Sequence, residues 1–203
     1  VDVYVKAAQL SGAKAAKFKI GGRMSRNLDT YPGRTETMMK LARKRFGDSF
    51  ILYADANGSY NAEKAIEVGR MLESLDVKFF EEPCPWEELS ETKKVADALR
   101  MPVAGGEQDA STWRFKWMVE NGVVQIVQPD LNYNGGFIRA LRVARIAAKQ
   151  NIPITPHNTQ TGASSVNILQ FASAVKNIGP HMEYPFRGKY DDASWYTPHF
   201  HIK

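Results

Sequence analysis

Short apolar runs and longer amphipathic stretches alternate along the whole chain of 203 residues. Seven of the runs are short and mostly rich in β-branched or aromatic residues, which is typical of β-strands. They cover residues 15–20, 49–54, 77–80, 101–105, 123–128, 151–155 and 181–184. Between them, helical patterns cover residues 35–46, 61–75, 91–100, 111–122, 135–150 and 162–175. Gly47 and Asn61 have residue types that favour a helix C-cap and N-cap.

This alternation predicts an α/β fold in which crossover helices join parallel strands. Two architectures fit it, an open doubly wound sheet and a closed (β/α) barrel. A dinucleotide-binding loop is not supported, because the segment after the first strand, IGGRMSR, does not have the G-x-G-x-x-G spacing.

Each predicted strand ends in an ionisable side chain. Lys17 and Lys19 end the first strand, and from the second strand onward the residues recur every 23 to 27 positions: Asp55, Glu81, Glu107, Asp130, His157 and Glu183. In an open sheet such positions would be spread along a line. In a barrel they meet at one mouth, where barrel enzymes carry their catalytic groups. The register therefore favours the barrel.

Three consecutive strand ends, Asp55, Glu81 and Glu107, carry carboxylates that would repel one another at a barrel mouth. A divalent cation would offset this repulsion, and ligands that are all oxygen favour Mg²⁺. Zinc is less favoured, because the nearest candidate histidine, His157, belongs to a strand two units farther on.

The two lysines of the first strand are separated by one residue, so they point to the same face. Two neighbouring ammonium groups disfavour each other's charge, so the pKa of one should fall towards the range in which an amine acts as a base. Asp130 and His157 end neighbouring strands. A carboxylate beside an imidazole fixes its tautomer and raises its basicity, which predicts His157 as a second acid/base.

Taken together, these motifs resemble those of the enolase superfamily, in its mandelate racemase and muconate lactonizing enzyme branch. The matching segments are K-F-K (17–19), D-A-N (55–57), E-E-P (81–83), G-G-E (105–107), P-D-x₄-G-G (129–136), P-H-N (156–158) and H-M-E (181–183). The resemblance implies a TIM-type α/β barrel that is incomplete here. We expect residues 1–203 to be a partial C-terminal barrel domain, without its first strand and without the N-terminal capping domain.

The resemblance also implies residue roles. Lys19 would remove the proton α to a substrate carboxylate, and Lys17 would bind that carboxylate. His157, oriented by Asp130, would act on the opposite face, and Glu183 would hydrogen-bond the carboxylate as charge builds on it. Stabilising the resulting enolate with Mg²⁺ is established chemistry for this superfamily.

The implied metal ligands are Asp55, Glu81 and Glu107, and Asn57 of the D-A-N motif is a further expected substrate contact. Strand alternation predicts that Glu82 turns away from the mouth while Glu81 faces it.

Dehydration of a sugar acid to a 2-keto-3-deoxy acid is the expected reaction. A racemase, epimerase or cycloisomerase of a hydroxy acid would use the same groups and stays open. The expected partner is thus a small carboxylate substrate, and we also expect a homo-oligomer.

A long segment after the first predicted strand delays the next helix and carries three arginines, Arg23, Arg26 and Arg34. Long loops of this kind are often functional lids. We expect an arginine here, with Arg23 as the first candidate, to contact a polar or anionic distal end of the substrate.

Composition narrows the remaining alternatives. The net charge of +5 would suit a non-catalytic basic binding module, but the basic residues are spread along amphipathic helices, so nucleic acid is not expected. No apolar run reaches the roughly 18 residues of a membrane span. The single cysteine, Cys84, suits a reducing cytoplasm and a structural role.

Overall fold

The computed structural model describes residues 1–159 and 163–184. Its elements are α1 (Asp2–Ser11), β1 (Ala15–Lys19), α2 (Arg34–Phe46), β2 (Ile51–Asp55), α3 (Ala62–Ser74), β3 (Phe80–Glu81), α4 (Leu89–Ala98), β4 (Val103–Gly105), α5 (Thr112–Glu120), β5 (Ile126–Val127), α6 (Phe137–Ala148) and α7 (Ala163–Ala174). The chain forms two compact units. The first comprises Val1–Gly105 with Trp117–Ile126, and the second comprises Gly106–Lys116 with the described residues from Val127 onward.

The strands form one sheet in the order β1-β2-β3-β4-β5. The first three pairings are parallel, as the alternating pattern predicts. Their register places Lys19 opposite Asp55, and Asp55 opposite Glu81. The ionisable residues that end β1, β2 and β3 are therefore neighbours across the sheet, which positions the site described below.

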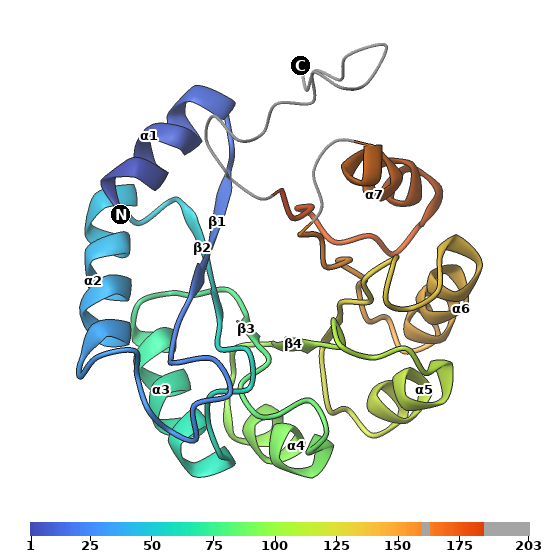
Figure 1. Ribbon diagram of the computed structural model, residues 1–203, viewed down its shortest axis with the longest axis horizontal. Helices are drawn as coiled ribbons and strands as arrows, with labels where there is room; N and C mark the ends of the chain where they lie inside the picture. The colour runs from blue at the N-terminus through green and yellow to red at the C-terminus, as the bar shows by residue number, and fades with distance from the viewer. Residues whose placement is uncertain (160–162, 185–203) are drawn as a thin grey trace. The chain divides into compact units, whose positions relative to one another are not determined.

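Helices α1 to α4 lie on one side of strands β1 to β4 (Figure 1). Helix α3 shows why: its buried residues include Ala65, Val68 and Leu72, which share one helical face. The two expected caps are confirmed. The Asn61 side chain accepts from the Lys64 N–H at 3.0 Å, and Gly47 ends α2 with a positive φ of 79°. No helix within the described residues is long and apolar enough to cross a membrane.

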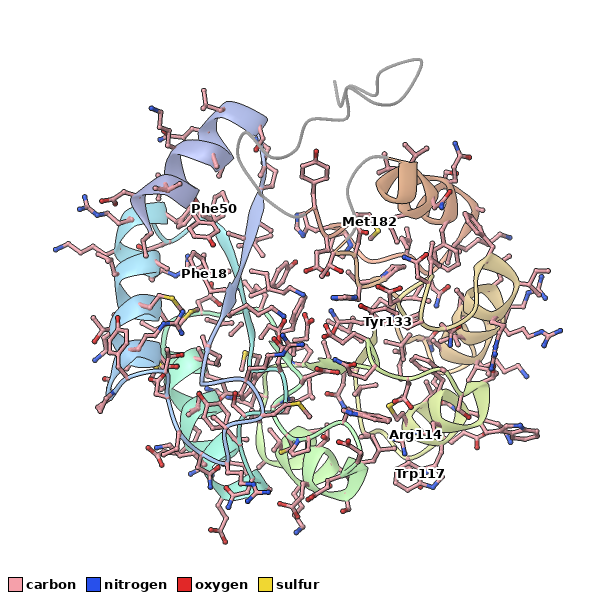
Figure 2. All side chains as sticks on the ribbon, in the orientation of Figure 1. Phe18, Phe50, Arg114, Trp117, Tyr133 and Met182 are labelled. Carbon is pink, nitrogen blue, oxygen red and sulfur yellow. The ribbon has the colours of Figure 1, made fainter. Side chains whose placement is uncertain are left out.

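Aromatic side chains fill the space between β1 and the first two helices. The Phe18 ring centroid lies 5.5 Å from that of Tyr4 and 6.1 Å from that of Phe46, and Phe46 stacks on Phe50 at 4.4 Å. Figure 2 shows Phe18 and Phe50 between β1 and these helices. Because Phe18 alternates with Lys17 and Lys19, its burial directs both lysines to the opposite face of the strand.

The second unit contains less regular strand pairing than the sequence predicts. The expected strand at 151–155 is reduced to bridges from Ile154 to Val127 and to Ile178. The strand expected at 181–184 is wrong, since those residues are irregular. The reason is that the backbone of Ile154 pairs with Asn177 and Gly179, which precede the predicted segment, at 2.9 and 2.8 Å.

The segment between β1 and α2 is held against the residues that follow β2. Met24 N–H donates to Asn57 O at 3.0 Å and Asn27 N–H to Ser59 O at 2.8 Å, while Asn61 N–H donates to the Asn27 side chain at 2.8 Å. The loop that was expected from its length to be a lid is therefore attached to the rest of the first unit by several hydrogen bonds of its backbone and side chains. These contacts connect the ends of β1 and β2.

We expect Gly21→Ala to destabilise the protein more than Gly12→Ala. Both glycines have positive φ, of 65° and 70°, where an alanine costs about 1–2 kcal/mol. A Cβ at Gly21 would also lie 2.6 Å from the Ser59 Cβ, whereas one at Gly12 meets nothing within 4 Å. Urea denaturation of both variants would measure the difference. Equal losses would show that the contact between the two loops carries no stability.

Candidate active site

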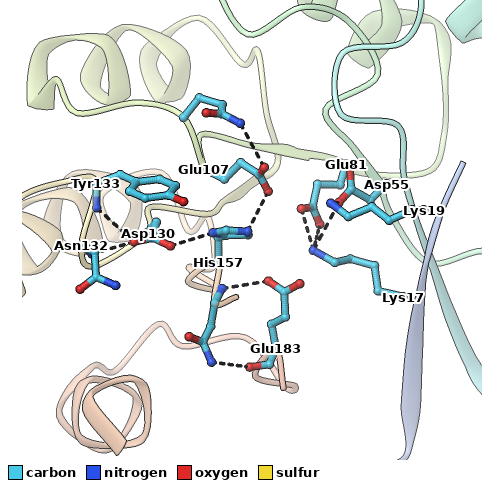
Figure 3. A network of polar contacts seen from close by, with 12 residues as sticks. Lys17, Lys19, Asp55, Glu81, Glu107, Asp130, Asn132, Tyr133, His157 and Glu183 are labelled. Carbon is cyan, nitrogen blue, oxygen red and sulfur yellow. Dashed lines mark hydrogen bonds and ion pairs between the residues drawn. The ribbon is translucent and has the colours of Figure 1, made fainter. Parts of the chain in front are cut away.

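Lys17 and Lys19 reach the carboxylates that end the two neighbouring strands. Lys17 Nζ lies 2.7 and 2.8 Å from the two Glu81 side-chain oxygens and 3.6 Å from Asp55 Oδ2. Lys19 Nζ contacts the same Asp55 oxygen (Figure 3). The exposed fraction of the Lys17 side chain is 14% and that of Lys19 is 52%. Lys17 is thus the more enclosed of the two side chains, and Lys19 is the more exposed.

Asp55 and Glu81 form a fully buried pair of acids. One oxygen of each lies within 4.8 Å of the other, a separation that a shared cation could bridge. Burial, together with the charge of Glu81, raises the pKa of Asp55 to about 6, although Lys17 and Lys19 oppose the rise. Since both groups supply only oxygen, the pair could hold a hard metal ion.

Asn57 lies in the turn that follows Asp55. Its backbone N–H donates to Asp55 Oδ1 at 2.9 Å, and its φ is positive, at 42°. This contact places Asn57 beside the acid pair. It is made by the backbone of Asn57 and helps to fix the Asp55 carboxylate.

The second unit contains a chain of three ionisable groups. His157 Nδ1 lies 2.8 Å from Asp130 Oδ2, and His157 Nε2 lies 3.3 Å from Glu107 Oε2 (Figure 3). All three residues are buried. Burial would raise the pKa of Asp130, but hydrogen bonds from His157 and from the N–H groups of Tyr133 and Asn132 lower it below its usual value. Asp130 therefore stays ionised and orients the imidazole, as the sequence predicts.

Glu183 is held in place by Asn158, the residue that directly follows His157. Asn158 N–H donates to Glu183 Oε2 at 2.9 Å, and the Asn158 side chain donates to the Glu183 carbonyl at 3.2 Å. Asn158 is not among the site residues predicted from the sequence. Its place in the P-H-N motif, directly after the histidine, was the available indication.

The three arginines of the loop after β1 have different surroundings. Arg23 and Arg26 are exposed and both have positive φ, whereas Arg34 donates from Nη1 to the Lys19 carbonyl at 3.2 Å. Arg34 thus supports the end of β1, whereas Arg23 and Arg26 are exposed residues of the loop.

Glu82 is buried, but strand alternation is not the reason. The residue has a φ of 40°, so the chain leaves the strand geometry directly after Glu81. Its backbone donates to Ala104 O at 3.0 Å and accepts from Gly58 N–H at 2.8 Å. These two contacts tie the residue directly after Glu81 to β4 and to the turn that follows β2.

Cys84 lies in the same segment and is buried. Burial, with smaller contributions from Glu91 and Glu88, raises the pKa of its thiol to about 12. A thiol that holds its proton so firmly is a poor nucleophile, in line with the structural role expected from the sequence.

Several known proteins are similar to this chain in sequence or in structure. Arabinonate dehydratase from Saccharolobus solfataricus is 31% identical over 82% of this chain and 43% of its own length. D-galactarolactone cycloisomerase from Agrobacterium fabrum is 32% identical over 87% and 48%. A solved structure of a proposed racemase from Roseobacter denitrificans has 38% identity and a TM-score of 0.90, over 92% of this chain and 51% of that one. The chain thus spans about half the length of these relatives.

The sequence profile of the enolase C-terminal domain-like family matches residues 2–202, which is nearly the whole chain. The superfamily inferred from the ordered motifs and the α/β barrel class are both confirmed by this match and by the structural likeness. The chain therefore belongs to the enolase C-terminal domain-like family and has its TIM-barrel-like α/β fold.

Proposed function

We propose that the protein is a Mg²⁺-dependent dehydratase of a sugar acid, which removes the proton α to the substrate carboxylate. The observation that carries this proposal is the exposed Lys19 side chain, whose amine contacts a buried acid pair. The similarity to an arabinonate dehydratase supports the reaction class. Because this chain corresponds to less than half of that relative, the activity is proposed for the protein that contains it.

Asp55, Glu81 and Glu107 are the proposed metal ligands. Two of them form the buried pair that the lysines neutralise, and their oxygen-only chemistry fits Mg²⁺. Glu107 follows Gly105, the last residue of β4, by two positions, so chain geometry alone keeps their Cα atoms within about 7.6 Å. In the bound state Mg²⁺ would supply positive charge that stabilises the substrate carboxylate when the α-proton leaves.

Lys19 is the proposed base because its side chain is the more exposed of the two. Lys17 would keep its place against Glu81 and present positive charge to the substrate carboxylate. A weakly acidic C–H requires such charges to be in place before the proton moves, because reorganising them during the reaction would raise the barrier.

His157 is the proposed second acid/base, and Asp130 fixes its tautomer through Nδ1. In a dehydratase, His157 would give a proton to the departing β-hydroxyl, so that water leaves and a 2-keto-3-deoxy acid forms. Glu183, held by Asn158, would donate a hydrogen bond to the substrate carboxylate from its protonated form. Asn57 is proposed to contact the substrate from the turn after β2.

A cycloisomerase is the second candidate. The observation that favours it is the 32% identity to a galactarolactone cycloisomerase over 87% of this chain. Both reactions would begin with the same proton removal, but a cycloisomerase releases no water. Product analysis after incubation with linear acids and with lactones would separate the two. A homo-oligomer and a cytoplasmic location stay predictions.

We expect solvent deuterium to enter the α-position of unreacted substrate, and C3 of a 2-keto-3-deoxy product, when the full-length protein works in D₂O with Mg²⁺. Lys19→Ala should abolish exchange from one face and His157→Asn from the other, with turnover reduced about 100-fold or more. NMR and mass spectrometry would measure the label. Lys40→Ala, which removes an exposed lysine of α2, is the matched control. Unchanged turnover in both site variants would overturn the mechanism.

Mg²⁺ affinity should be constant at neutral pH and fall as the pH drops below about 6. The pKa of Asp55 is raised to about 6, so below that value a proton must leave before the metal can bind. One displaced proton weakens binding by up to about tenfold per pH unit. Calorimetry at pH 5, 6 and 7.5 would measure this, and Asp55→Asn should remove the pH dependence together with most of the affinity. An affinity that does not change between pH 5 and 7.5 would contradict the assignment of Asp55.

Arg23→Ala should lower kcat/KM about tenfold for sugar diacids and less for monoacids, because a guanidinium pairs with a distal carboxylate. Arg26→Ala is the matched control, since both arginines are exposed and have positive φ. Steady-state kinetics of both variants with paired mono- and diacid substrates would measure the effect. If Arg23→Ala stays within a few-fold of the unaltered protein for every active substrate, Arg23 does not bind substrate.

A further inference from the structure

Asp130 fixes two different parts of the second unit with its two carboxylate oxygens. Oδ2 holds the His157 ring at 2.8 Å, while Oδ1 accepts from the backbone N–H groups of Asn132 and Tyr133 at 2.7 and 3.1 Å. The backbone of Tyr133 is therefore fixed by the same group that fixes His157. A ligand that engages the imidazole would meet Tyr133 in a constant position.

The turn that carries Tyr133 is closed by further backbone bonds. Asn134 N–H donates to Asp130 O at 2.8 Å, and Gly136 N–H donates to Leu131 O at 2.7 Å. Gly135 and Gly136 have φ values of 88° and 92°, a region that side chains other than hydrogen rarely allow. The P-D-x₄-G-G motif thus builds a rigid turn with Tyr133 on it.

Tyr133 is exposed, whereas Asp130 and His157 are buried. Half of the residue, 50%, is accessible, compared with 3% of His157. The two ring centroids lie 6.2 Å apart with an interplanar angle of 32° (Figure 3). Next to the buried imidazole, Tyr133 is therefore an exposed residue whose side chain carries an aromatic ring and a hydroxyl group.

We propose that Tyr133 is a specificity-determining residue that contacts the substrate next to the carbon served by His157. This inference rests on the proposed function. An aromatic face packs against C–H groups, and a phenol hydroxyl both donates and accepts hydrogen bonds. A polyhydroxylated carbon chain offers both kinds of group, so Tyr133 favours substrates that carry a hydroxyl group on the carbons adjoining the reacting centre.

The position of Tyr133 separates this role from that of an ordinary surface tyrosine. Its contact with Asp130 is made by the backbone, so replacing the side chain leaves the Asp130–His157 bond in place. A change in substrate preference without a change in the titration of His157 would therefore report contact with substrate. Loss of structure would change both.

Binding and turnover of sugar acids by the full-length protein with Mg²⁺ would test the proposal. A panel of aldonic and aldaric acids is first screened by thermal shift, and the acids that stabilise the unaltered protein serve as probes. Tyr133→Ala should weaken binding and raise KM about tenfold for hydroxylated probes. Tyr133→Phe should weaken binding and raise KM by a smaller factor. Trp113→Ala, which removes an aromatic side chain that is 80% exposed on α5, should change neither.

Each outcome of this experiment has a distinct meaning. A tenfold loss in Tyr133→Ala, with the pH profile of turnover unmoved, supports the assignment. Unchanged affinity, KM and substrate preference in both Tyr133 variants overturn it, while the proposed function stands. A pH profile that shifts with Tyr133→Phe also overturns it, since the residue would then act on His157. If no acid of the panel binds or turns over with the unaltered protein, the proposed function fails, and this inference fails with it.

Discussion

The burial of Asp55 and Glu81 is the constraint on which the first unit depends. Two fully buried carboxylates are costly unless positive charge offsets them, and here Lys17 and Lys19 provide it. The cost is visible in the raised pKa of Asp55. Burial and the charge of Glu81 raise this pKa by more than the two lysines lower it. A buried carboxylate lowers stability while it is charged, so a pair of them at two strand ends indicates that the charges serve function rather than folding.

Parallel strand pairing positions the charged groups relative to one another. Asp55 is opposite both Lys19 and Glu81, so three strand ends lie at neighbouring positions without any dedicated loop. The backbone of Glu82 then ties the end of β3 to Ala104 and to Gly58. These hydrogen bonds of the following residue limit the movement of Glu81, which suits a carboxylate that must meet a metal ion at a set distance.

A different device operates in the second unit. There one carboxylate, Asp130, orients the imidazole with one oxygen and holds the following turn with the other. Asn158 likewise connects His157 to Glu183, because it is the next residue in the chain and binds the glutamate with both backbone and side chain. Proton-transfer groups and the surfaces around them are thus fixed by shared anchors.

Much of this could be predicted from the sequence because the information is local. The alternation of apolar runs and amphipathic stretches determined the α/β class, and the caps at Gly47 and Asn61 follow from the preferences of single residues. The positions of Asp55 and Glu81 at strand ends also follow from the pattern. The strand predicted at 181–184 is wrong because the residue that pairs with Ile154 in the folded chain is Ile178, which lies before the predicted segment.

Only the tertiary structure decided which groups meet. Lys17 binds Glu81 across 64 positions of sequence, and Lys19 takes Asp55 instead, a choice set by strand register and side-chain direction. Arg34 turned out to support the Lys19 carbonyl, and Tyr133 to lie beside His157. The sequence by itself determined the chemical groups and their order along the chain. Their partners and their exposure depended on packing between distant segments, which no local pattern encodes.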